Sequence, residues 1–398
     1  MTLGPNAGRI GMVAGEPSGD LLASRIMRGL QAGMPDVQCE GIGGPAMQQQ
    51  GLQCWHPMHA LTVFGYVDAL KRLPSLLRTY GDVKSRWLRQ PPSVFVGIDA
   101  PDFNLRLEQQ LKAAGVPTVH FVGPSIWAWR YERIHTIRKA VSHMLVLFPF
   151  ETAIYEKEGI PVTYVGHPLA QDIPMQPDRE GARTRLGLPT GARVLAVLPG
   201  SRRSEVALLA PRFLSAVQIL QAQDPDLQIL VPMVNAQRRE QFAQLLAQTP
   251  VRNLHMLQQQ DSEAGRPAAW QTMEAADAVL VASGTATLET ALFKRPMVIS
   301  YVLSPLMRRL MAWKSGQEKP LLPWVGLPNV LLNDFAVPEL LQEDATPEKL
   351  AEATWTALTD PALAQDLYQR FSALHASLLR DTPGLAAEVI LKLARHAG

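Results

Sequence analysis

The amino-acid sequence predicts an α/β protein made of two Rossmann-like, doubly wound lobes followed by a C-terminal helical tail. Two stretches begin alike, each with a short apolar strand, a loop of small residues and a helical run; their strands are residues 9–13 and 193–198. Strands that are apolar throughout are typical of parallel sheets covered by helices on both faces. The 398 residues suit two domains of ~100–200 residues each. A tandem of two unrelated Rossmann-like domains is the alternative that this pattern leaves open.

Further strand-loop-helix units follow each of the two openings. Each predicted strand is a short apolar run between turn residues, as in a buried parallel sheet. These strands are 93–98, 118–122 and 144–147 in the first half, and 228–232, 278–282 and 297–301 in the second.

The predicted division of the chain is a first lobe over residues 1–171, a second over 172–345, and helices over 346–398 that pack back on the lobes or on a partner protomer. Residues 172–191 are rich in Pro, Gly and charge and are interpreted as a linker. The last ~50 residues show helical periodicity and no strand pattern. Ligands of open α/β sheets bind at the carboxyl ends of the strands, so we expect a binding site in the loops after the strands, facing a cleft.

Composition narrows the class of protein. With 47% hydrophobic residues, 19% charged residues and a net charge of +2, the chain is not a strongly basic nucleic-acid binder. Its two cysteines, Cys39 and Cys54, form no CxxC motif, which disfavours a disulfide framework or a zinc site and favours a reducing compartment. No secretory signal pattern and no run of ~18 apolar residues is visible, so we expect a protein that is soluble or lies on a membrane.

Two loops of the first half contain small residues beside a strand end. Residues 15–20 include Glu16 and Asp20 and open a helix, whose N-terminus favours an anion. A structural turn with Asp20 as N-cap explains this loop equally well. The second loop contains Gly43 and Gly44 and is weak evidence by itself.

Asp99 ends a predicted strand, and Asp102 follows it across Pro101. A carboxylate at that place is positioned to deprotonate a hydroxyl, and such proton transfer is typically worth ~10²–10⁴-fold in rate. Capping of the next helix is the alternative role, more so for Asp102 than for Asp99.

An aromatic stretch at residues 125–130 contains Trp127 and Arg130. Tryptophan suits the face of a sugar and arginine suits a phosphate. Packing between lobes remains an equal alternative.

In the second half, Ser201 and Arg202 lie at a strand-helix junction, where backbone N–H groups and a guanidinium suit a diphosphate. Small residues also begin a helix after the strand 278–282. The predicted second-half site therefore comprises Ser201, Arg202, Ser283, Gly284, Thr285, Glu289 and Asn329.

Two of these residues have alternative interpretations, Glu289 as a solvated helix position and Asn329 as a turn residue. The only D-x-D sequence, residues 224–226, precedes a strand and is interpreted as a turn. A metal-dependent transferase is therefore disfavoured, and no metal or other cofactor is predicted.

Residues 61–77 form an amphipathic, basic segment whose apolar side chains gather near one face. Such a helix suits a bilayer interface, where each cation adds roughly 1 kcal/mol on anionic lipid, although Pro74 would bend or break it. An ordinary core-facing helix is the alternative. The predicted membrane contacts are Val63, Phe64, Val67, Leu70, Leu73, Leu76 and Leu77.

Taken in order, these loops resemble the signatures of the lipid-A-disaccharide synthase family over roughly residues 10–341. The longer, more specific strings are AGEPSGD at 14–20, GIDAPDFN at 97–104 and PSIWAWR at 124–130. GIGG at 41–44, GHPL at 166–169, PGSRRSE at 199–205, SGTATLE at 283–289 and LPN at 327–329 accompany them.

The resemblance implies the GT-B fold and an inverting glycosyl transfer from UDP-2,3-diacylglucosamine to 2,3-diacylglucosamine 1-phosphate (lipid X). The products would be the β-1,6-linked disaccharide 1-phosphate and UDP. It implies Asp99 as the base, with Glu16 and Asp102 as further cleft carboxylates. It also implies an acceptor site in the first lobe, which we assign to Gly43, Gly44, Trp127 and Arg130.

The same resemblance implies that the second-half residues bind the UDP-sugar, with Glu289 on the ribose. It implies a homodimer located peripherally on the cytoplasmic face of the inner membrane of a Gram-negative bacterium. The rival functions are another two-lobed UDP-N-acetylglucosamine enzyme, namely a peptidoglycan glycosyltransferase or an epimerase, and a non-catalytic nucleotide-sugar or lipid-binding module.

Overall fold

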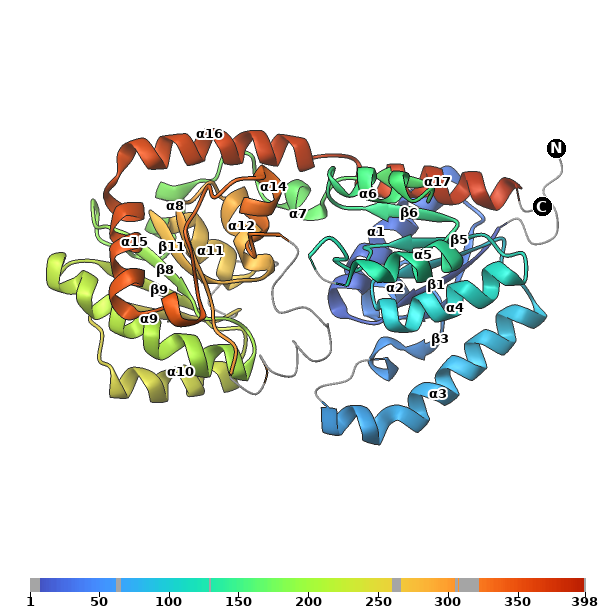
Figure 1. The fold of residues 1–398 in the computed structure, drawn as a ribbon, viewed down its shortest axis with the longest axis horizontal. Helices are drawn as coiled ribbons and strands as arrows, with labels where there is room; N and C mark the ends of the chain where they lie inside the picture. The colour runs from blue at the N-terminus through green and yellow to red at the C-terminus, as the bar shows by residue number, and fades with distance from the viewer. Residues whose placement is uncertain are drawn as a thin grey trace. The chain divides into compact units, whose positions relative to one another are not determined.

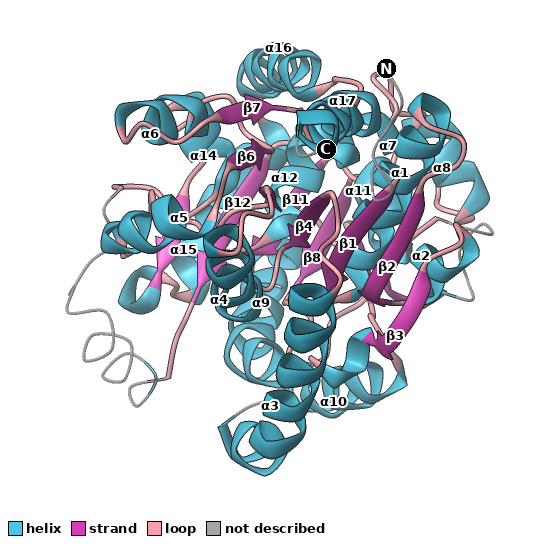
Figure 2. Ribbon diagram, turned by 90° about the vertical axis from the view of Figure 1, so that its right-hand side faces the viewer, coloured by secondary structure: helices cyan, strands magenta, loops and turns pink. Residues whose placement is uncertain are grey.

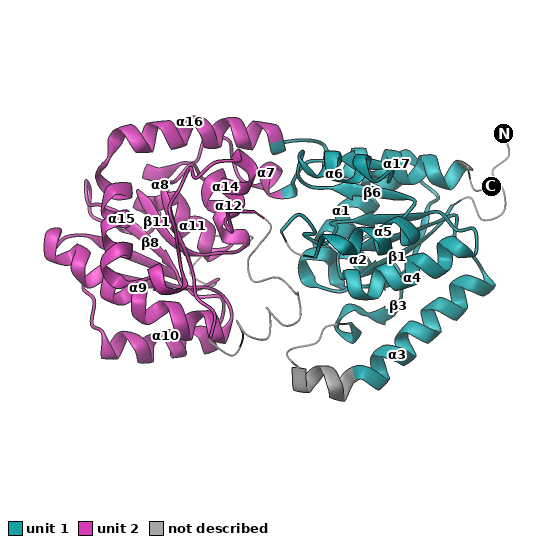
Figure 3. Cartoon of the chain, viewed as in Figure 1, with its two compact units in different colours: residues 1–168, 378–398 teal, residues 169–377 magenta. Residues whose placement is uncertain are grey.

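The chain folds into two compact units in the computed structural model, which describes residues 8–61, 66–128, 130–259, 266–304, 307 and 322–396. Unit 1 comprises residues Met1–Pro168 and Leu378–Gly398, and unit 2 comprises Leu169–Ser377 (Figure 3). The C-terminal helices do not form a unit of their own.

Unit 1 contains a seven-stranded parallel sheet in the order β3-β2-β1-β4-β5-β6-β7 (Figure 2). The order reverses beside β1, because the chain passes from β3 back across the sheet to β4. This is the doubly wound arrangement that the apolar strands predict. The strands are β1 (Arg9–Ala14), β2 (Gln38–Gly43), β3 (Gln53–Pro57), β4 (Val94–Ile98), β5 (Thr118–Phe121), β6 (His143–Val146) and β7 (Val162–Tyr164).

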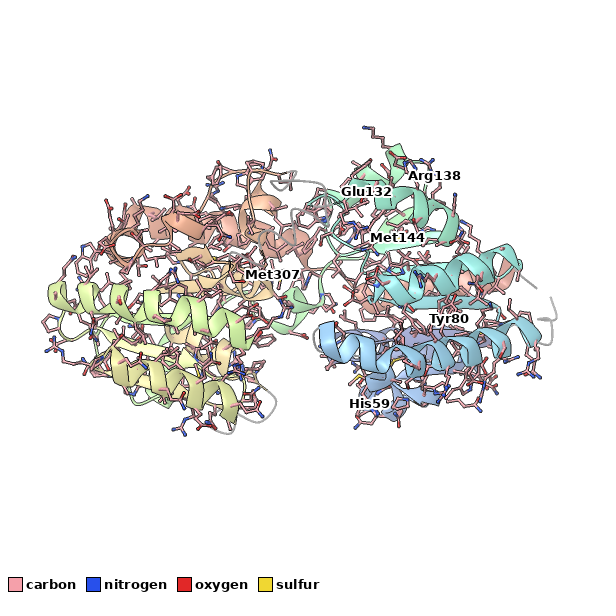
Figure 4. All side chains as sticks on the ribbon, turned by 60° about the horizontal axis from the view of Figure 1, so that its bottom comes forward. His59, Tyr80, Glu132, Arg138, Met144 and Met307 are labelled. Atoms are coloured by element: carbon pink, nitrogen blue, oxygen red, sulfur yellow. The ribbon has the colours of Figure 1, made fainter. Side chains whose placement is uncertain are left out.

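Helices cover both faces of this sheet. On one face α1 packs against α17, and on the other α3 packs against α4, with Trp87 and Phe95 in the buried cluster between helices and sheet. Tyr80 of α3, labelled in Figure 4, meets the Phe103 ring edge-on at 5.4 Å between centroids. The helices are α1 (Pro17–Gly33), α2 (Pro45–Gln49), α3 (Tyr66–Arg89), α4 (Pro101–Ala113), α5 (Ile134–Ala140), α6 (Glu151–Lys157) and α17 (Thr382–His396).

The last helix is tied to unit 1 by hydrogen bonds as well as by packing. The backbone N–H of His167 donates to Leu378 O at 3.0 Å, and the Thr382 hydroxyl donates to Val165 O at 2.9 Å. Ile390, on α17, is fully buried. The end of the chain therefore completes the N-terminal unit.

Unit 2 contains a six-stranded parallel sheet in the order β10-β9-β8-β11-β12-β13, visible around β8 and β11 in Figure 1. Strands β8, β9, β11 and β12 are buried almost throughout, which is why the sequence shows them as apolar runs. The strands are β8 (Val194–Leu198), β9 (Gln228–Pro232), β10 (Leu254–Leu257), β11 (Ala278–Ala282), β12 (Met297–Tyr301) and β13 (Glu339–Leu341).

The helices of unit 2 likewise cover two faces. A large apolar cluster joins α9, α10 and α15 to one face of the sheet, and a smaller one joins α8 and α11 to the other. The helices are α7 (Pro168–Asp172), α8 (Arg179–Arg185), α9 (Arg203–Gln223), α10 (Ala236–Gln248), α11 (Ala268–Ala275), α12 (Thr285–Leu292), α14 (Leu327–Leu332), α15 (Pro347–Thr359) and α16 (Pro361–Leu378).

The segment interpreted as a linker, residues 172–191, is instead part of unit 2. It contains α8, and Leu186 and Leu188 pack on the buried cluster around Ala182. Charged residues misled the sequence interpretation because they form ion pairs; Arg183, for example, lies 2.7 Å from Asp277.

Candidate functional site

The carboxyl ends of β1 and β4 bring Glu16 and Asp99 to the same edge of the unit 1 sheet. The two strands pair in register, Ala14 opposite Ile98, so the loops that follow them start side by side. Glu16 is exposed and stands at the N-cap of α1. Asp99 is half-buried where β4 turns into α4. The two predicted carboxylates thus share a sheet edge that is typical of ligand sites in this class of fold.

The turn at Asp99 has an unusual backbone. Asp99 has a φ of 51° and Ala100 a φ of 43°, so two successive residues other than glycine occupy the left-handed region. Each such residue costs roughly 1–3 kcal/mol, and such strain is concentrated at functional sites. Asp99 is therefore held in a conformation that the chain alone would not choose.

Asp102 has a different environment. It lies in the first turn of α4, its side chain is 94% exposed, and it forms an ion pair with Arg133 at 2.7 Å. Of the two aspartates, Asp99 is the one at the strained strand end.

Gly43 and Gly44 are buried, and the structure supplies a packing reason for both. The Asp20 carboxylate accepts hydrogen bonds from Gly44 N at 2.9 Å, Ala46 N at 2.9 Å and Met47 N at 3.0 Å. A Cβ on Gly44 would lie 2.5 Å from Asp20 Oδ2. Asp20 therefore caps α2, whereas the sequence had suggested it as the N-cap of α1. The acceptor role of the two glycines stays a prediction.

Trp127 and Arg130 lie in the loop after β5. The Trp127 ring meets the Phe150 ring edge-on with centroids 5.3 Å apart, at the start of α6. Arg130 has a φ of 61° and lies 3.2 Å from Glu132, its side chain 42% exposed. Glu132 is labelled in Figure 4. The loop is thus packed against the start of α6 at Trp127 and open to solvent at Arg130.

Glu151 is a buried carboxyl beside Trp127 that the sequence did not reveal. It is 5% exposed and accepts a hydrogen bond from Phe148 N at 3.1 Å. Burial raises its pKa to about 7, partly offset by hydrogen bonds from backbone N–H groups and from the Trp127 side chain. Nearby, the His167 ring stacks on Phe148 at 5.6 Å, and burial lowers the pKa of His167 to about 4. No sequence motif marks Glu151, because its raised pKa follows from burial, which the local sequence does not show.

We expect Glu151→Gln to remove a pH dependence of stability. Since the pKa of this carboxyl is about 7 in the folded protein and about 4.3 in an unfolded chain, the folded state binds more protons between these values. The carboxyl therefore lowers the free energy of unfolding as pH rises through this window. Relative to Glu151→Gln, the unmodified protein should lose about 1–3 kcal/mol between pH ~5 and pH ~8 in urea denaturation.

Glu156→Gln, an exposed carboxylate on the same helix, is the matched control and should leave the pH dependence unchanged. Parallel curves for the unmodified protein and Glu151→Gln would refute the raised pKa.

Unit 2 contains a pocket of about 420 Å³ at the carboxyl ends of its strands. Five of the residues predicted from sequence line it: Ser201, Arg202, Ser283, Gly284 and Thr285. They come from the loops after β8 and β11, which are adjacent in the sheet. The remaining wall contains Pro232, Met233 and Val234 after β9, Gln259, and the start of α11.

The donors of this pocket are gathered around Glu205. Its Oε2 accepts hydrogen bonds from Ser201 N at 3.0 Å and Arg202 N at 3.1 Å, at the N-terminus of α9. Gly200 has a φ of 107°, and a Cβ there would lie 2.6 Å from Glu205. Two backbone N–H groups and an arginine whose side chain is 78% exposed therefore converge on one place. Such an arrangement binds anions.

Tyr301 is a further neighbour of this loop that sequence reasoning missed. It ends β12, next to β11 in the sheet. Burial raises the pKa of its hydroxyl, Glu205 raises it further and Arg202 lowers it. The sequence did contain a signal for Tyr301, because it is the last residue of a predicted strand, where ligand sites are expected.

Glu289 lies on α12, one turn beyond Thr285, and does not line the pocket. Burial raises the pKa of its carboxyl, and the Trp270 side chain partly offsets this. Trp270 follows Ala269, which is part of the pocket wall. Glu289 is therefore adjacent to the wall, and its contact with a ribose stays a prediction.

Asn329 is fully buried and does not line the pocket either. Its amide donates to Val337 O and Glu339 Oε1, both at 2.8 Å, and accepts from Val337 N at 3.0 Å. These bonds fix the start of α14 to the segment before β13. The structure thus gives Asn329 a structural role.

The segment predicted to contact a membrane forms the first part of α3. Val63 and Phe64 lie outside the described residues, and for Val67 and Leu70 only the backbone is described. Leu73 is 46% exposed, Leu77 57% exposed and Leu76 half-buried. The helix continues through Pro74. Two of the predicted leucines therefore have large exposed surfaces on one helix.

Two further properties concern the part of the chain that the structure describes. None of the helices in this part of the chain is both long and apolar enough to cross a membrane. Nor do the described His, Cys, Asp and Glu residues gather in groups of three or more that could hold a metal ion.

Comparison with known proteins gives matches over nearly the full chain. The model of the family described as Lipid-A-disaccharide synthetase matches residues 10–390. A Lipid-A-disaccharide synthase of Bordetella avium is 72% identical over 98% of this chain and 99% of the relative. One of Chromobacterium violaceum is 48% identical over 97% of each chain.

Solved structures share the fold at low sequence identity. A glycosyltransferase involved in lipopolysaccharide biosynthesis, 15% identical, matches 96% of this chain and 99% of its own with a TM-score of 0.58. The UDP-GlcNAc 2-epimerase of Neisseria meningitidis, 10% identical, matches 96% of this chain and 98% of its own with a TM-score of 0.62. The predicted GT-B fold is confirmed.

Proposed function

Because the chain belongs to the lipid-A-disaccharide synthase family and is a hexosyltransferase of lipid A biosynthesis, we propose a division of its chemistry between the two units. Unit 1 holds the acceptor lipid X beside Asp99, and unit 2 holds UDP-2,3-diacylglucosamine in the pocket lined by Ser201 and Arg202. The observation that carries the proposal is this pocket, where two N–H groups and an arginine converge at the start of α9. The epimerase and peptidoglycan alternatives are not favoured, since the relatives of high identity have one name throughout.

In this mechanism the Asp99 carboxylate accepts the proton of the acceptor's primary hydroxyl. The hydroxyl oxygen attacks C1 of the donor sugar while the bond from C1 to the diphosphate breaks, so the anomeric configuration inverts. The electron pair of that bond leaves with UDP. Glu16, at the same sheet edge, is a second carboxylate next to the acceptor. Trp127 supplies a ring for the sugar of the acceptor, and Arg130 supplies a cation for its phosphate.

The leaving diphosphate gains negative charge as the bond breaks. Donors that meet this charge in a fixed arrangement stabilise the transition state more than the ground state. In this proposal Arg202 and the N–H groups of Ser201 and Arg202 are those donors, and Ser283, Gly284 and Thr285, which line the same pocket, contact the donor as well. A bound diphosphate would compete with Glu205 for the same N–H groups.

The direct test incubates the purified protein with UDP-2,3-diacylglucosamine and lipid X, without added metal, and measures UDP release and disaccharide formation. We expect both products in equal amounts, and none from either substrate alone. UDP-GlcNAc incubated alone should not change, whereas its conversion to an epimer would contradict the proposal.

The membrane proposal rests on α3. Both substrates carry acyl chains, and the exposed leucines of α3 with nearby Arg78 suit the interface of an anionic bilayer. We infer a peripheral location on the cytoplasmic face of the inner membrane of a Gram-negative bacterium. A homodimer remains a prediction from the sequence resemblance.

Leu73→Ser combined with Leu77→Ser should weaken sedimentation with anionic liposomes about 100-fold or more, because burial of each leucine in lipid is worth ~1.5–3 kcal/mol and each 1.4 kcal/mol is about tenfold in affinity. UDP binding should be unchanged. Leu88→Ser, which is 40% exposed near the other end of α3, is the control and should sediment like the unmodified protein. Equal binding by all three proteins would count against α3 as the membrane contact.

A further inference from the structure

A buried side chain, that of Asn104, donates a hydrogen bond to the strained turn at Asp99 and Ala100. Asn104, which is fully buried on α4, donates its amide to Asp99 O at 2.7 Å. Its Nδ2 also lies 3.4 Å from Val13 O and 3.4 Å from Ile98 O, at the ends of β1 and β4. The Asn104 side chain thus contacts backbone carbonyl groups of β1 and β4, the two strands that lead to Glu16 and Asp99.

The backbone around the turn is fixed on its other sides too. Asp99 N donates to Phe121 O at 2.9 Å, and Phe103 N and Asn104 N both donate to Ala100 O at 3.0 Å. Positive φ angles at two residues other than glycine persist only where the surroundings over-determine them. Among the described residues, the Asn104 amide is the side-chain donor to the Asp99 carbonyl oxygen.

Asn104 is itself held in place by a close approach of α4 to β4. A Cβ on Gly97 would lie 2.2 Å from Glu108 Oε1 and 2.9 Å from Asn104 Cβ. One turn further along α4, the Glu108 carboxyl contacts His120 Nδ1 of β5 at 2.7 Å, with both side chains fully buried. Polar groups are costly to bury without a partner. Because moving α4 away from β5 would separate this pair, the pair helps to fix the position of α4 and of Asn104.

We propose that Asn104 is a positioning residue for the reaction, which keeps the Asp99–Ala100 turn in its left-handed conformation and so aims the Asp99 carboxylate. This inference rests on the proposed role of Asp99. Without the amide, the turn relaxes toward negative φ, and the carboxylate leaves its position at the sheet edge. Asn104 does not touch the reacting atoms.

The test is a double-mutant cycle on the full-length enzyme. Asn104→Ala should lower kcat about 10–100-fold, with KM for both substrates changed less than about threefold, because a misplaced base weakens the transition state and not binding. Asp99→Asn with Asn104→Ala should be no slower than Asp99→Asn alone. Multiplied effects in the double variant would overturn the proposal.

Rescue separates positioning from general stability. Adding Ala100→Gly to Asn104→Ala should raise kcat at least several-fold above that of Asn104→Ala alone, because glycine adopts positive φ without the steric cost. This double variant also serves if Asn104→Ala alone does not fold. Gln110→Ala, which removes an α4 side-chain bond to the Tyr80 hydroxyl at 2.8 Å, should leave kcat unchanged. Absence of rescue would overturn the inference.

The two hypotheses fail in different ways. If Asp99→Asn retains full turnover, the proposed function of Asp99 fails and Asn104 has nothing to position. If Asp99→Asn is inactive while Asn104→Ala has normal kcat, only the inference about Asn104 fails.

Discussion

Replacing Asp99 by Asn should lower kcat by ~10²–10⁴-fold while UDP binding stays the same. Asparagine keeps the size of the side chain and tolerates positive φ, so the turn at 51° need not change. What is lost is the group that accepts the proton of the acceptor hydroxyl. The measurement is steady-state UDP release, with UDP affinity followed by calorimetry.

Asp102→Asn is the matched control. Asp102 is close in the chain and carries the same charge, but its exposed side chain pairs with Arg133. Exposed ion pairs contribute only ~0–1 kcal/mol to stability, so the fold should be kept and activity should fall less than about fivefold. The mechanism is wrong if the two aspartate variants show the same activity.

Replacing Arg202 by Ala should lower kcat/KM by ~10²–10³-fold and weaken UDP binding about tenfold or more. Its guanidinium is mostly exposed at the pocket, so its removal leaves no buried cavity. The loss should be larger in kcat than in KM, since charge on the diphosphate grows as the bond breaks. Initial rates over a range of donor concentrations measure both.

Arg203→Ala provides the comparison for this loop. Arg203 is the next residue, it is exposed, and it is not among the residues that line the described pocket. We expect nearly full activity and unchanged UDP affinity. An equal loss in both variants would indicate a non-specific effect of positive charge and contradict a specific role for Arg202.

The central strands of both sheets could be predicted from sequence because they are buried on both faces. The edge strands β3, β7, β10 and β13, and also β2 beside β3, were not among the predicted strands, since they are short or carry polar residues. In β2, Glu40 is buried yet lies 2.7 Å from Arg9 and accepts a hydrogen bond from the Trp87 indole at 3.2 Å. A polar residue satisfied by a partner 47 positions away is invisible to a local pattern.

The candidate site shows the same division. Ser201, Arg202, Ser283, Gly284 and Thr285 were found because strand, loop and helix follow one another in the sequence, and the structure brings all five to one pocket. Asn329 was expected in a loop, whereas the structure places it in α14 with its side chain fully buried, which no local pattern reveals. Glu151 and the partners of Asn104 depend on tertiary packing.

The return of α17 to unit 1 has a consequence for synthesis on the ribosome. Residues 378–398 leave the exit tunnel after all of unit 2, yet α1 packs against the helix that they form. Unit 2 is contiguous in the chain and can finish folding first, which reverses the usual order of N-terminal domains before later ones. Until α17 has emerged, the nascent first unit displays an apolar helix face, and a stop codon before α17 would leave that face uncovered.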